Sequence, residues 1–382
     1  MSKAKPTALV TGASGLAGGY MLAHLLEQGG WDIVAVSRRK PRIAGDYRHI
    51  AVDLLDPADC RTKLAPLSNI SHLFYLAITE RADPTETVVA NANMFFNLVK
   101  TVEAASPALE HVHLSQGTRW YGNHLGPYKT PTREDDPRHM PPNFYYDQQD
   151  FLEEFQKGKR WTWSVGRPHA VCGFSTGGPM NLTLAIAVYA NVCKALGLPL
   201  SFPGKPGAYT ALYQCTDAAL LAKAVEWMAT DPKCANQAFN ITNSDLIRWQ
   251  NLWPKFANFF GMELAPPRHI NLARSMADKG PIWEKIVERN RLQKFHFEEI
   301  AAWGYPDGVF ASDYDIVSDT SKARRFGFHD LVDTEEMFLR MFSDFRRERI
   351  IPQHSERSRR VRQSQLITCD GSDQGNGRSP WP

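Results

Sequence analysis

The amino-acid sequence predicts an α/β fold in which a doubly wound parallel sheet is followed by a smaller C-terminal subdomain. Short apolar segments with strand character alternate with longer segments whose apolar residues recur at helical spacing. This alternation is typical of βαβ units and a parallel sheet. A glycine-rich turn joins the first strand to the first helix, and its position indicates a Rossmann-type sheet.

The expected elements follow one another with short connections. Strands are expected at residues 7–11, 32–37, 49–53, 72–77, 111–115 and 163–167. Helices are expected at residues 15–28, 56–67, 87–106 and 145–157. The second of these helices is opened by Asp56 as its cap and Pro57 in its first turn. Residues 117–142 are expected to form a polar, proline-rich loop before the sixth strand.

Composition excludes several classes of protein. Lys and Arg number 44 against 41 Asp and Glu, and this near balance argues against a nucleic-acid partner. The six cysteines show no CxxC spacing, which disfavours a zinc site or a disulfide framework. No apolar run reaches the ~20 residues of a membrane helix, and no signal peptide is apparent. We expect a cytoplasmic protein without membrane insertion, present as a monomer or homodimer.

The turn after the first strand has GxxGxxG spacing. Gly12 permits the tight turn, Gly15 lets backbone N–H groups approach a pyrophosphate, and Gly18 lets the helix lie close to the strand. A glycine triplet alone is a weak signal, but this one follows a strand and opens a helix, as dinucleotide binding requires. Ser14 and Leu16 are therefore expected beside the cofactor.

The end of the second strand indicates which dinucleotide binds. An acidic residue there would bond the ribose 2′-OH of NAD, whereas this chain has Ser37, Arg38 and Arg39. Guanidinium groups pair with phosphate oxygens, so we expect NADPH with both arginines on its 2′-phosphate. The alternative is an exposed basic turn. The remaining contacts expected on the adenine side and the cofactor path are Asp53, Leu54 and Ala77.

The second half of the chain has a different organisation. Helices are expected at residues 181–196, 217–228 and 245–260, around a short strand at 238–242. We expect residues 1–352 to form one extended domain, with about 1–175 mainly binding the dinucleotide. Residues of about 176–352 would mainly bind substrate, with strands that return to the sheet. Residues 353–382 have almost no periodic apolar residues and are expected to form a disordered tail.

The common catalytic signatures are missing from the sequence. No hydrolase elbow or metal-ligand cluster is recognisable, and no metal is expected. His111 and His113 share one face of a strand and are interpreted as polar residues at a sheet edge. Dehydrogenases of this fold commonly use Tyr-x-x-x-Lys on one helix. Here Gln149 lies four residues after Tyr145, so that lysine is absent.

The sequence resembles the progesterone 5β-reductase/iridoid synthase family of atypical extended short-chain dehydrogenases/reductases. The resemblance rests on the motifs NFYY at residues 143–146, GTRWY at 117–121 and LGP at 125–127, together with RP at 167–168, GFS at 173–175 and Trp283. It runs from about Ala8 to Pro352. The combination is specific, whereas each motif alone is not.

The resemblance implies an NADPH-dependent 1,4-reduction of the C=C bond of an enone or enal. The substrate is expected to be a small, mostly apolar carbonyl compound. The catalytic tyrosine of the family falls on Tyr145 and its catalytic lysine on Arg119. An arginine there keeps the charge but is longer, planar and always protonated. Hydride would reach the β-carbon while Tyr145 and Arg119 hold the enolate oxygen. The alternative for Tyr145 is an aromatic core residue.

Further site residues are expected around this pair. Ser115, Gln116, Pro168 and Val171 follow the fifth and sixth strands and are expected to contact the cofactor. His169, between the last two, is interpreted as structural. The expected lining of the substrate pocket is Trp120, Phe174, Met180, Tyr213 and Tyr314.

Two other functions remain open from the sequence. One is a carbonyl reductase, epimerase or dehydratase of the extended short-chain type, which the missing Tyr-x-x-x-Lys disfavours. The other is a non-catalytic NADP(H)-binding sensor, which the arginine at position 119 keeps open.

Overall fold

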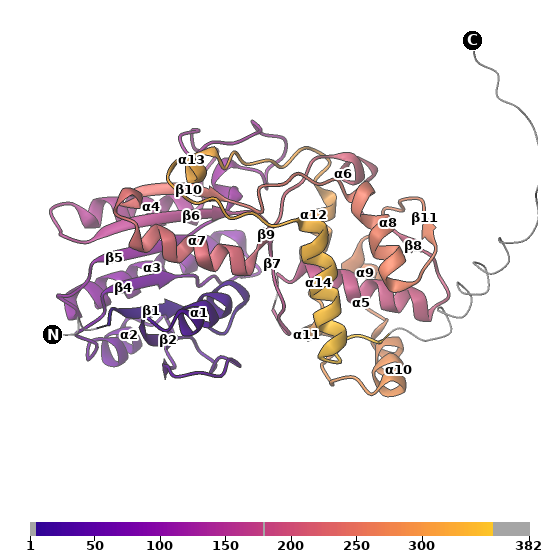
Figure 1. Ribbon diagram of the computed structural model, residues 1–382, viewed down its shortest axis with the longest axis horizontal. Coiled ribbons are helices and arrows are strands. Elements are labelled where there is room, and N and C mark those ends of the chain that lie inside the picture. The colour runs from indigo at the N-terminus through magenta and orange to yellow at the C-terminus, as the bar shows by residue number, and fades with distance from the viewer. Residues whose placement is uncertain (1–4, 179, 354–382) are drawn as a thin grey trace, which may run out of the picture.

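A computed structural model describes residues 5–178 and 180–353, and it confirms the doubly wound parallel sheet. Seven strands lie in the order β10-β6-β5-β4-β1-β2-β3, and each pairs in parallel with its neighbour (Figure 1). The strands are β1 (Thr7–Thr11), β2 (Asp32–Val36), β3 (Arg48–Ile50), β4 (His72–Tyr75), β5 (His111–Ser115), β6 (Thr162–Pro168) and β10 (Gln237–Ile241). The order reverses between β1 and β4, and sheets of this kind bind ligands at that switch point.

Helices cover both faces of the sheet. Helices α1 (Leu16–Gln28) and α7 (Ala218–Thr230) lie on one face, where Leu22 and Val225 share a core with β1 residues. Helices α2 (Pro57–Leu64), α3 (Pro84–Ala105) and α4 (Phe144–Gln156) form the core of the opposite face together with apolar residues of β4 and β5. A 3₁₀ turn, η1 (Thr118–Tyr121), follows β5 within the predicted 117–142 loop.

Several element boundaries differ from the sequence prediction, and for two of them a local side-chain hydrogen bond explains the difference. The helix expected at 87–106 begins at Pro84, since Asp83 caps it by accepting a hydrogen bond from the Thr85 N–H at 2.7 Å. The strand expected at 49–53 ends at Ile50. Asp53 instead forms a turn in which its carboxylate accepts from the Leu55 N–H at 3.0 Å.

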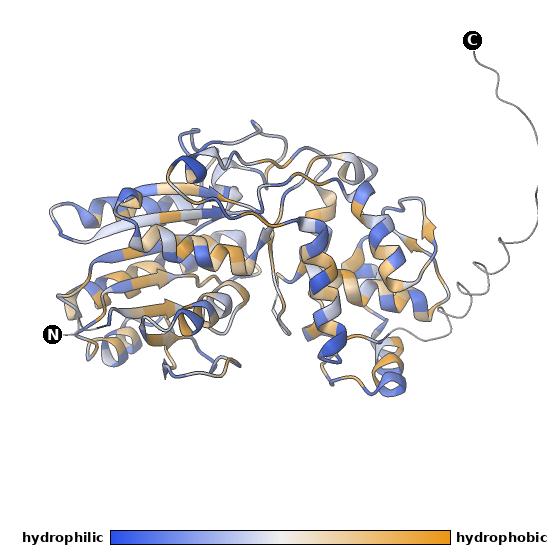
Figure 2. Ribbon diagram, viewed as in Figure 1, coloured by the Kyte–Doolittle hydropathy of each residue, from blue (hydrophilic) through white to orange (hydrophobic). Residues whose placement is uncertain are grey.

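The C-terminal half forms a second core that is mostly helical. Figure 1 shows these helices beside the carboxyl edge of the sheet, and Figure 2 shows the alternating apolar and polar residues of α14. Large aromatic side chains such as Trp249, Trp253 and Phe338 fill this core. Its elements are β7 (Val171–Cys172), α5 (Leu182–Ala195), β8 (Leu200–Ser201), α6 (Pro206–Thr210), β9 (Thr216–Asp217), α8 (Trp249–Phe260), β11 (Leu264–Ala265), α9 (Leu272–Ser275), α10 (Gly280–Asn290), α11 (Phe297–Ile300), α12 (Gly304–Ala311) and α14 (Thr334–Arg347).

The chain crosses between the two cores more than once. Strand β7 follows β6 and pairs in parallel with β9 at the junction. The chain returns to the sheet through β10 and again through α13 (Ser321–Arg325), which lies against β10. The short turn η2 (Pro232–Cys234) connects α7 to β10. The helix expected at 245–260 begins only at Trp249.

The placement of His111 and His113 at a sheet edge is wrong. Strand β5 lies between β4 and β6, and both rings are buried. The Ser164 hydroxyl joins them, 2.8 Å from His111 Nε2 and 2.9 Å from His113 Nδ1. Burial lowers the pKa of His113 to about 3, so this ring is neutral near pH 7. Among the described residues no group of three or more His, Cys, Asp or Glu could hold a metal ion.

The five cysteines in the described part of the chain are free and buried: Cys60, Cys172, Cys193, Cys215 and Cys234. No helix among the described residues is long and apolar enough to cross a bilayer. The predicted tail, apart from Gln353, lies outside the described residues.

Candidate active site

The glycine turn lies against the end of β4, and only glycine fits there. Gly12 has φ +65°, and a Cβ atom on it would lie 2.6 Å from the Leu76 carbonyl oxygen. A Cβ on Gly18 would lie 2.3 Å from the Gly12 carbonyl oxygen. Gly15 caps α1 without a side-chain hydrogen bond, which leaves the backbone N–H groups of the first turn facing outward. This cradle fits a pyrophosphate, and Ala77 lies beside it.

The end of β2 is shaped by Ser37 and His49. The Ser37 hydroxyl donates to the Arg39 carbonyl oxygen at 2.6 Å, and His49 Nε2 donates to the Ser37 carbonyl oxygen at 3.1 Å. These bonds hold the turn, while the side chains of Arg38 and Arg39 remain exposed. Two guanidinium groups are therefore free to meet an anion at the carboxyl edge of the sheet.

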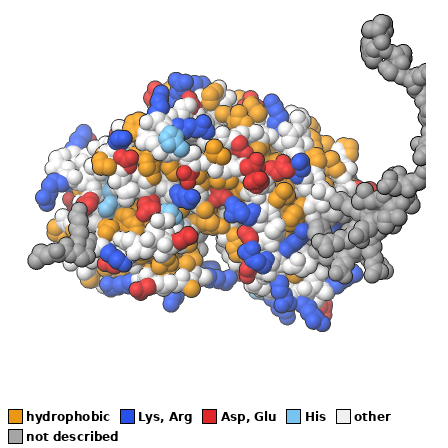
Figure 3. All heavy atoms as spheres, in the orientation of Figure 1, with side chains coloured by type: hydrophobic (Ala, Val, Ile, Leu, Met, Phe, Trp, Pro, Cys, Tyr) orange, Lys and Arg blue, Asp and Glu red, His pale blue; other side chains and the backbone are white. Residues whose placement is uncertain are grey.

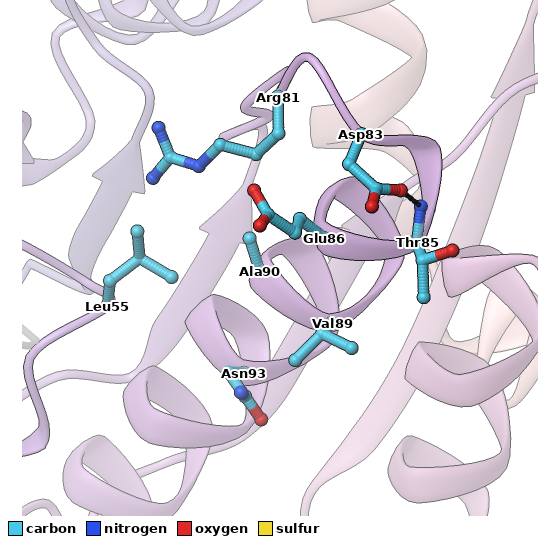
Figure 4. A pocket seen from close by; sticks show the side chains of 8 residues that line it. All are labelled: Leu55, Arg81, Asp83, Thr85, Glu86, Val89, Ala90 and Asn93. Atoms are coloured by element: carbon cyan, nitrogen blue, oxygen red, sulfur yellow. Dashed lines mark hydrogen bonds between the residues drawn. The ribbon is translucent and has the colours of Figure 1, made fainter.

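A pocket of about 400 Å³ opens between the segment after β3 and the first turns of α3. Figure 4 shows Arg81, Glu86 and Val89 on its α3 side and Leu55 opposite them. The preceding residue, Leu54, is buried, and its carbonyl oxygen accepts from Asn97 at 3.0 Å. The expected adenine contacts Asp53 and Leu54 directly precede the lining residue Leu55 in the chain, and their contact with a cofactor stays a prediction.

One side chain ties the expected catalytic pair together. Asn143 caps α4 by accepting from the Tyr145 N–H at 3.0 Å, and its amide nitrogen donates to the Arg119 carbonyl oxygen at 2.8 Å. The backbone of η1 is therefore fixed against the first turn of α4. Arg119 is exposed, whereas the Tyr145 side chain is buried.

The Tyr145 hydroxyl points to the carboxyl end of β5. A Cβ placed on Gly117 would lie 3.2 Å from this hydroxyl and 3.3 Å from the Pro168 carbonyl oxygen. The hydroxyl forms no hydrogen bond with the residues that the structure describes. Burial raises the pKa of Tyr145, the charge of Arg119 lowers it, and Glu80 raises it further. The phenol is therefore protonated at neutral pH and can donate to a ligand oxygen.

Two residues of this site were missed by sequence reasoning. Burial raises the pKa of both Tyr145 and Tyr305. The charge of Arg119 lowers the pKa of both hydroxyls, and the charge of Glu80 raises it. Glu80 follows β4 by a few residues, and its place at a strand's carboxyl end could have identified it. Tyr305 belongs to α12 and is brought in from the distant helical core, for which the sequence carries no local signal.

A buried arginine organises the floor of the site. Arg167 is 1% exposed, lies with its guanidinium 3.8 Å from the centre of the Trp120 ring, and donates to Gln116 Oε1 at 3.3 Å. Gln116 in turn donates to the Tyr145 carbonyl oxygen at 2.8 Å. Trp120 is thereby enclosed by Arg167 and the edge of Tyr146. Its role as pocket lining stays a prediction.

The expected nicotinamide end is formed where β5 and β6 stop. Ser115 is half-buried, and its hydroxyl oxygen lies 3.1 Å from His113 Nε2. Pro168 ends β6, and Ala170 then adopts φ +41°, an uncommon conformation for a residue with a side chain. This turn leads the chain into Val171 of β7. The structure thus brings Ser115, Gln116 and Pro168 to the edge occupied by Tyr145.

The other expected pocket residues lie at the boundary with the helical core. Tyr213 is buried, and Phe174 is half-buried against Phe345, with ring centroids 5.0 Å apart. Tyr314 donates through its hydroxyl to the Asn123 carbonyl oxygen at 2.6 Å. Met180 is half-buried. On the face in view, Figure 3 shows an indentation between the sheet and the helical part, with Lys and Arg side chains beside it.

Some known proteins are similar to this chain in sequence, and others share its fold. The chain is 34% identical over 368 residues to a 3-oxo-Delta(4,5)-steroid 5-beta-reductase of Arabidopsis thaliana, covering 90% of this chain and 93% of the relative. It is 35% identical over 363 residues to an (S)-8-oxocitronellyl enol synthase of Nepeta racemosa, with the same coverage of both chains. A UDP-glucose 4-epimerase of Thermotoga maritima shares the fold with a TM-score of 0.62, at 16% identity and coverage of 89% and 99%.

The parallel sheet, the glycine cradle and these relatives define an oxidoreductase of the short-chain dehydrogenase/reductase class. Residues 51–352 match the model of the PRISE-like Rossmann-fold domain. The chain belongs to that family, as the resemblance in its motifs predicted.

Proposed function

We propose that this protein is an NADPH-dependent reductase of the C=C bond of an α,β-unsaturated carbonyl compound. The observation that carries the proposal is the Tyr145 hydroxyl, which lies against Gly117 without a hydrogen-bond partner among the described residues and under the charge of Arg119. The reductase and enol synthase relatives support the same chemistry.

The residues present fit a dinucleotide. Gly12, Gly15 and the first turn of α1 would hold its pyrophosphate, while Arg38 and Arg39 would hold the 2′-phosphate of NADPH. The bound nicotinamide supplies the hydride.

The protein's own groups act on the substrate oxygen. Tyr145 donates its hydroxyl proton in a hydrogen bond to the carbonyl oxygen, which gains negative charge as the β-carbon is reduced. A proton from solvent then adds to the α-carbon and gives the saturated carbonyl compound. Arg119 stabilises that charge electrostatically. The burial of Tyr145 strengthens the hydrogen bond from its own hydroxyl, because a buried group is less screened by water than an exposed one. Asn143 keeps the two groups in register through its paired hydrogen bonds.

Product analysis tests the reaction directly. The full chain is incubated with NADPH and a panel of enones, enals and matched saturated ketones, and the products are identified by mass spectrometry. We expect saturated carbonyl products from the enones and enals and no turnover of the saturated ketones. Alcohols as the only products would favour a carbonyl reductase, and NADPH binding without any turnover would favour a sensor.

The cofactor choice makes a separate prediction. Replacing Arg38 and Arg39 together by alanine should raise the Kd for NADPH by about 30- to 100-fold, since two charge-assisted contacts to a phosphate are lost. The Kd for NADH should stay unchanged, as should that for NADPH in an Arg61→Ala control on α2. Both are measured by fluorescence titration. An equal loss of NADH affinity would show that the arginines do not select the phosphate.

A further inference from the structure

The pocket in front of α3 is lined by two charged side chains, Arg81 and Glu86, that the protein leaves unpaired. Both are exposed, and neither side chain forms a hydrogen bond or an ion pair with another residue that the structure describes. Figure 4 shows the two side chains extending over the pocket, one from the segment before α3 and one from its first turn. The volume of about 400 Å³ falls within the range of small-molecule sites. A positive and a negative group are therefore available to a ligand here.

The walls of this pocket are apolar. Val89 and Ala90 form its α3 side, and Leu55 lies opposite them (Figure 4). Val89 is 55% exposed, so a ligand that covers it removes apolar surface from water. Apolar side chains on two sides and charged groups at one edge fit a flat heteroaromatic ring, which packs against the walls and forms hydrogen bonds at its edge.

Hydrogen bonds fix the backbone on both sides of the pocket. The Arg81 N–H donates to the Thr87 hydroxyl oxygen at 2.9 Å, which holds the segment before α3 against the first turns of that helix. Asn97 of α3 donates to the Leu54 carbonyl oxygen at 3.0 Å, which joins α3 to the segment after β3. The two walls therefore keep their positions before a ligand binds, and this lowers the entropy cost of binding.

The pocket lies at the same edge of the sheet as the glycine cradle and the basic turn. Gly12 of the cradle lies against the Leu76 carbonyl oxygen after β4, and the chain reaches Arg81 a few residues later. Leu55 follows β3, which pairs with β2, and β2 ends at the basic turn. A dinucleotide with its pyrophosphate on the cradle and its 2′-phosphate on the basic turn therefore has its base near this pocket.

We propose that Arg81 and Glu86 select adenine as the base of the dinucleotide. The inference rests on the proposed function, which supplies the identity of the ligand. The base packs between Leu55 and Val89, the Glu86 carboxylate accepts a hydrogen bond from its 6-amino group, and the Arg81 guanidinium donates to a ring nitrogen. Both charged residues are thus specificity-determining residues in addition to the contacts expected after β3.

A dinucleotide that carries hypoxanthine provides the matched comparison. Hypoxanthine has an oxygen at position 6, where adenine has the amino group, so this edge offers the Glu86 carboxylate an acceptor in place of a donor. The wild type should bind reduced nicotinamide hypoxanthine dinucleotide phosphate about tenfold more weakly than NADPH, the usual effect of one lost hydrogen bond. Fluorescence titration of the full chain measures both Kd values.

Three variants assign the preference to the pocket. In Glu86→Gln the amide offers an acceptor to adenine and a donor to hypoxanthine, so the two Kd values should differ by less than about twofold. Arg81→Ala should raise the Kd of NADPH about tenfold. Glu103→Gln is the control, because Glu103 lies on the same helix outside the pocket and pairs with Lys159. It should keep the full preference for adenine.

The outcomes separate this inference from the proposed reaction. Equal affinity of the wild type for the two dinucleotides would overturn the inference, as would a Glu86→Gln variant that keeps the preference of the wild type. A fall in Tm of that variant with unchanged preference would show that the carboxylate only stabilises the first turn of α3. Enone reduction without base preference contradicts the inference alone. Base preference without any turnover supports the inference and contradicts the proposed reductase.

Discussion

Replacing Tyr145 by phenylalanine should lower kcat for enone reduction by about 10²- to 10⁴-fold, the usual contribution of one positioned proton donor. The Kd of NADPH should change little. Stability should not fall, because the Tyr145 hydroxyl makes no hydrogen bond with the described residues and its removal leaves no partner unsatisfied. Steady-state kinetics and thermal unfolding measure the two effects.

The neighbouring tyrosine provides a matched control. The Tyr146 hydroxyl donates to the Trp120 carbonyl oxygen at 2.7 Å and accepts from the His139 N–H at 2.9 Å. Tyr146→Phe should therefore lower the free energy of unfolding by about 1–2 kcal/mol and leave kcat nearly unchanged. If Tyr145→Phe kept full activity, Tyr145 would be a core aromatic residue and the proposed mechanism would be wrong.

Replacing Arg167 by methionine should lower the free energy of unfolding by about 3–5 kcal/mol, because a buried hydrogen-bond network loses its centre. The guanidinium donates to Gln116, Tyr121, Gln149 and the Glu134 carbonyl oxygen over 3.1–3.3 Å. Methionine fills similar space but leaves these acceptors without their donor. Denaturant unfolding with linear extrapolation measures the loss.

Arg138 serves as the control for this change. It also lies over the Trp120 ring, at 4.9 Å, but is exposed and paired with Asp150. Arg138→Met should cost at most about 1 kcal/mol. The Arg167 variant should also lose turnover if assayed while folded, because Gln116 then no longer holds the Tyr145 carbonyl oxygen in place. A loss below about 1 kcal/mol for Arg167→Met would contradict the network's importance.

The two effects differ in kind. Tyr145 is expected to act on reacting atoms with little effect on folding, whereas Arg167 is a positioning residue whose removal affects folding first. Comparing their kcat and stability changes therefore separates the chemistry of the site from its support.

Much of the sheet was predictable because its signals are local. Strands such as β1 and β5 were located to the residue, since a buried parallel strand is a short apolar run ended by glycine or polar residues. The glycine turn was identified for the same reason, because its GxxGxxG spacing lies within a few residues, although the Leu76 carbonyl oxygen that excludes a Cβ atom on Gly12 comes from a distant segment. The start of helix α3 was predicted at residue 87 instead of Pro84, because the sequence prediction did not use Asp83 as the cap of the helix.

The site was predictable only where a motif marked it. The sequence alone indicated Tyr145, Arg119 and the basic turn at Arg38, and the structure brings the first two together through Asn143. No pattern in the sequence indicated that Trp120 is enclosed by Arg167, or that Tyr305 of α12 lies near enough to be affected by Arg119 and Glu80. These contacts join residues far apart in the chain.

The sequence by itself determined the alternation of strands and helices, the glycine cradle and the family, because each depends on residue type and spacing along a short stretch. The tertiary structure alone decided that β5 is a central strand with buried histidines, that Tyr145 is buried near the charges of Arg119 and Glu80, and that His169 keeps an unpartnered nitrogen. Strand order and burial depend on which distant segments fill the remaining space, and no local pattern encodes that choice.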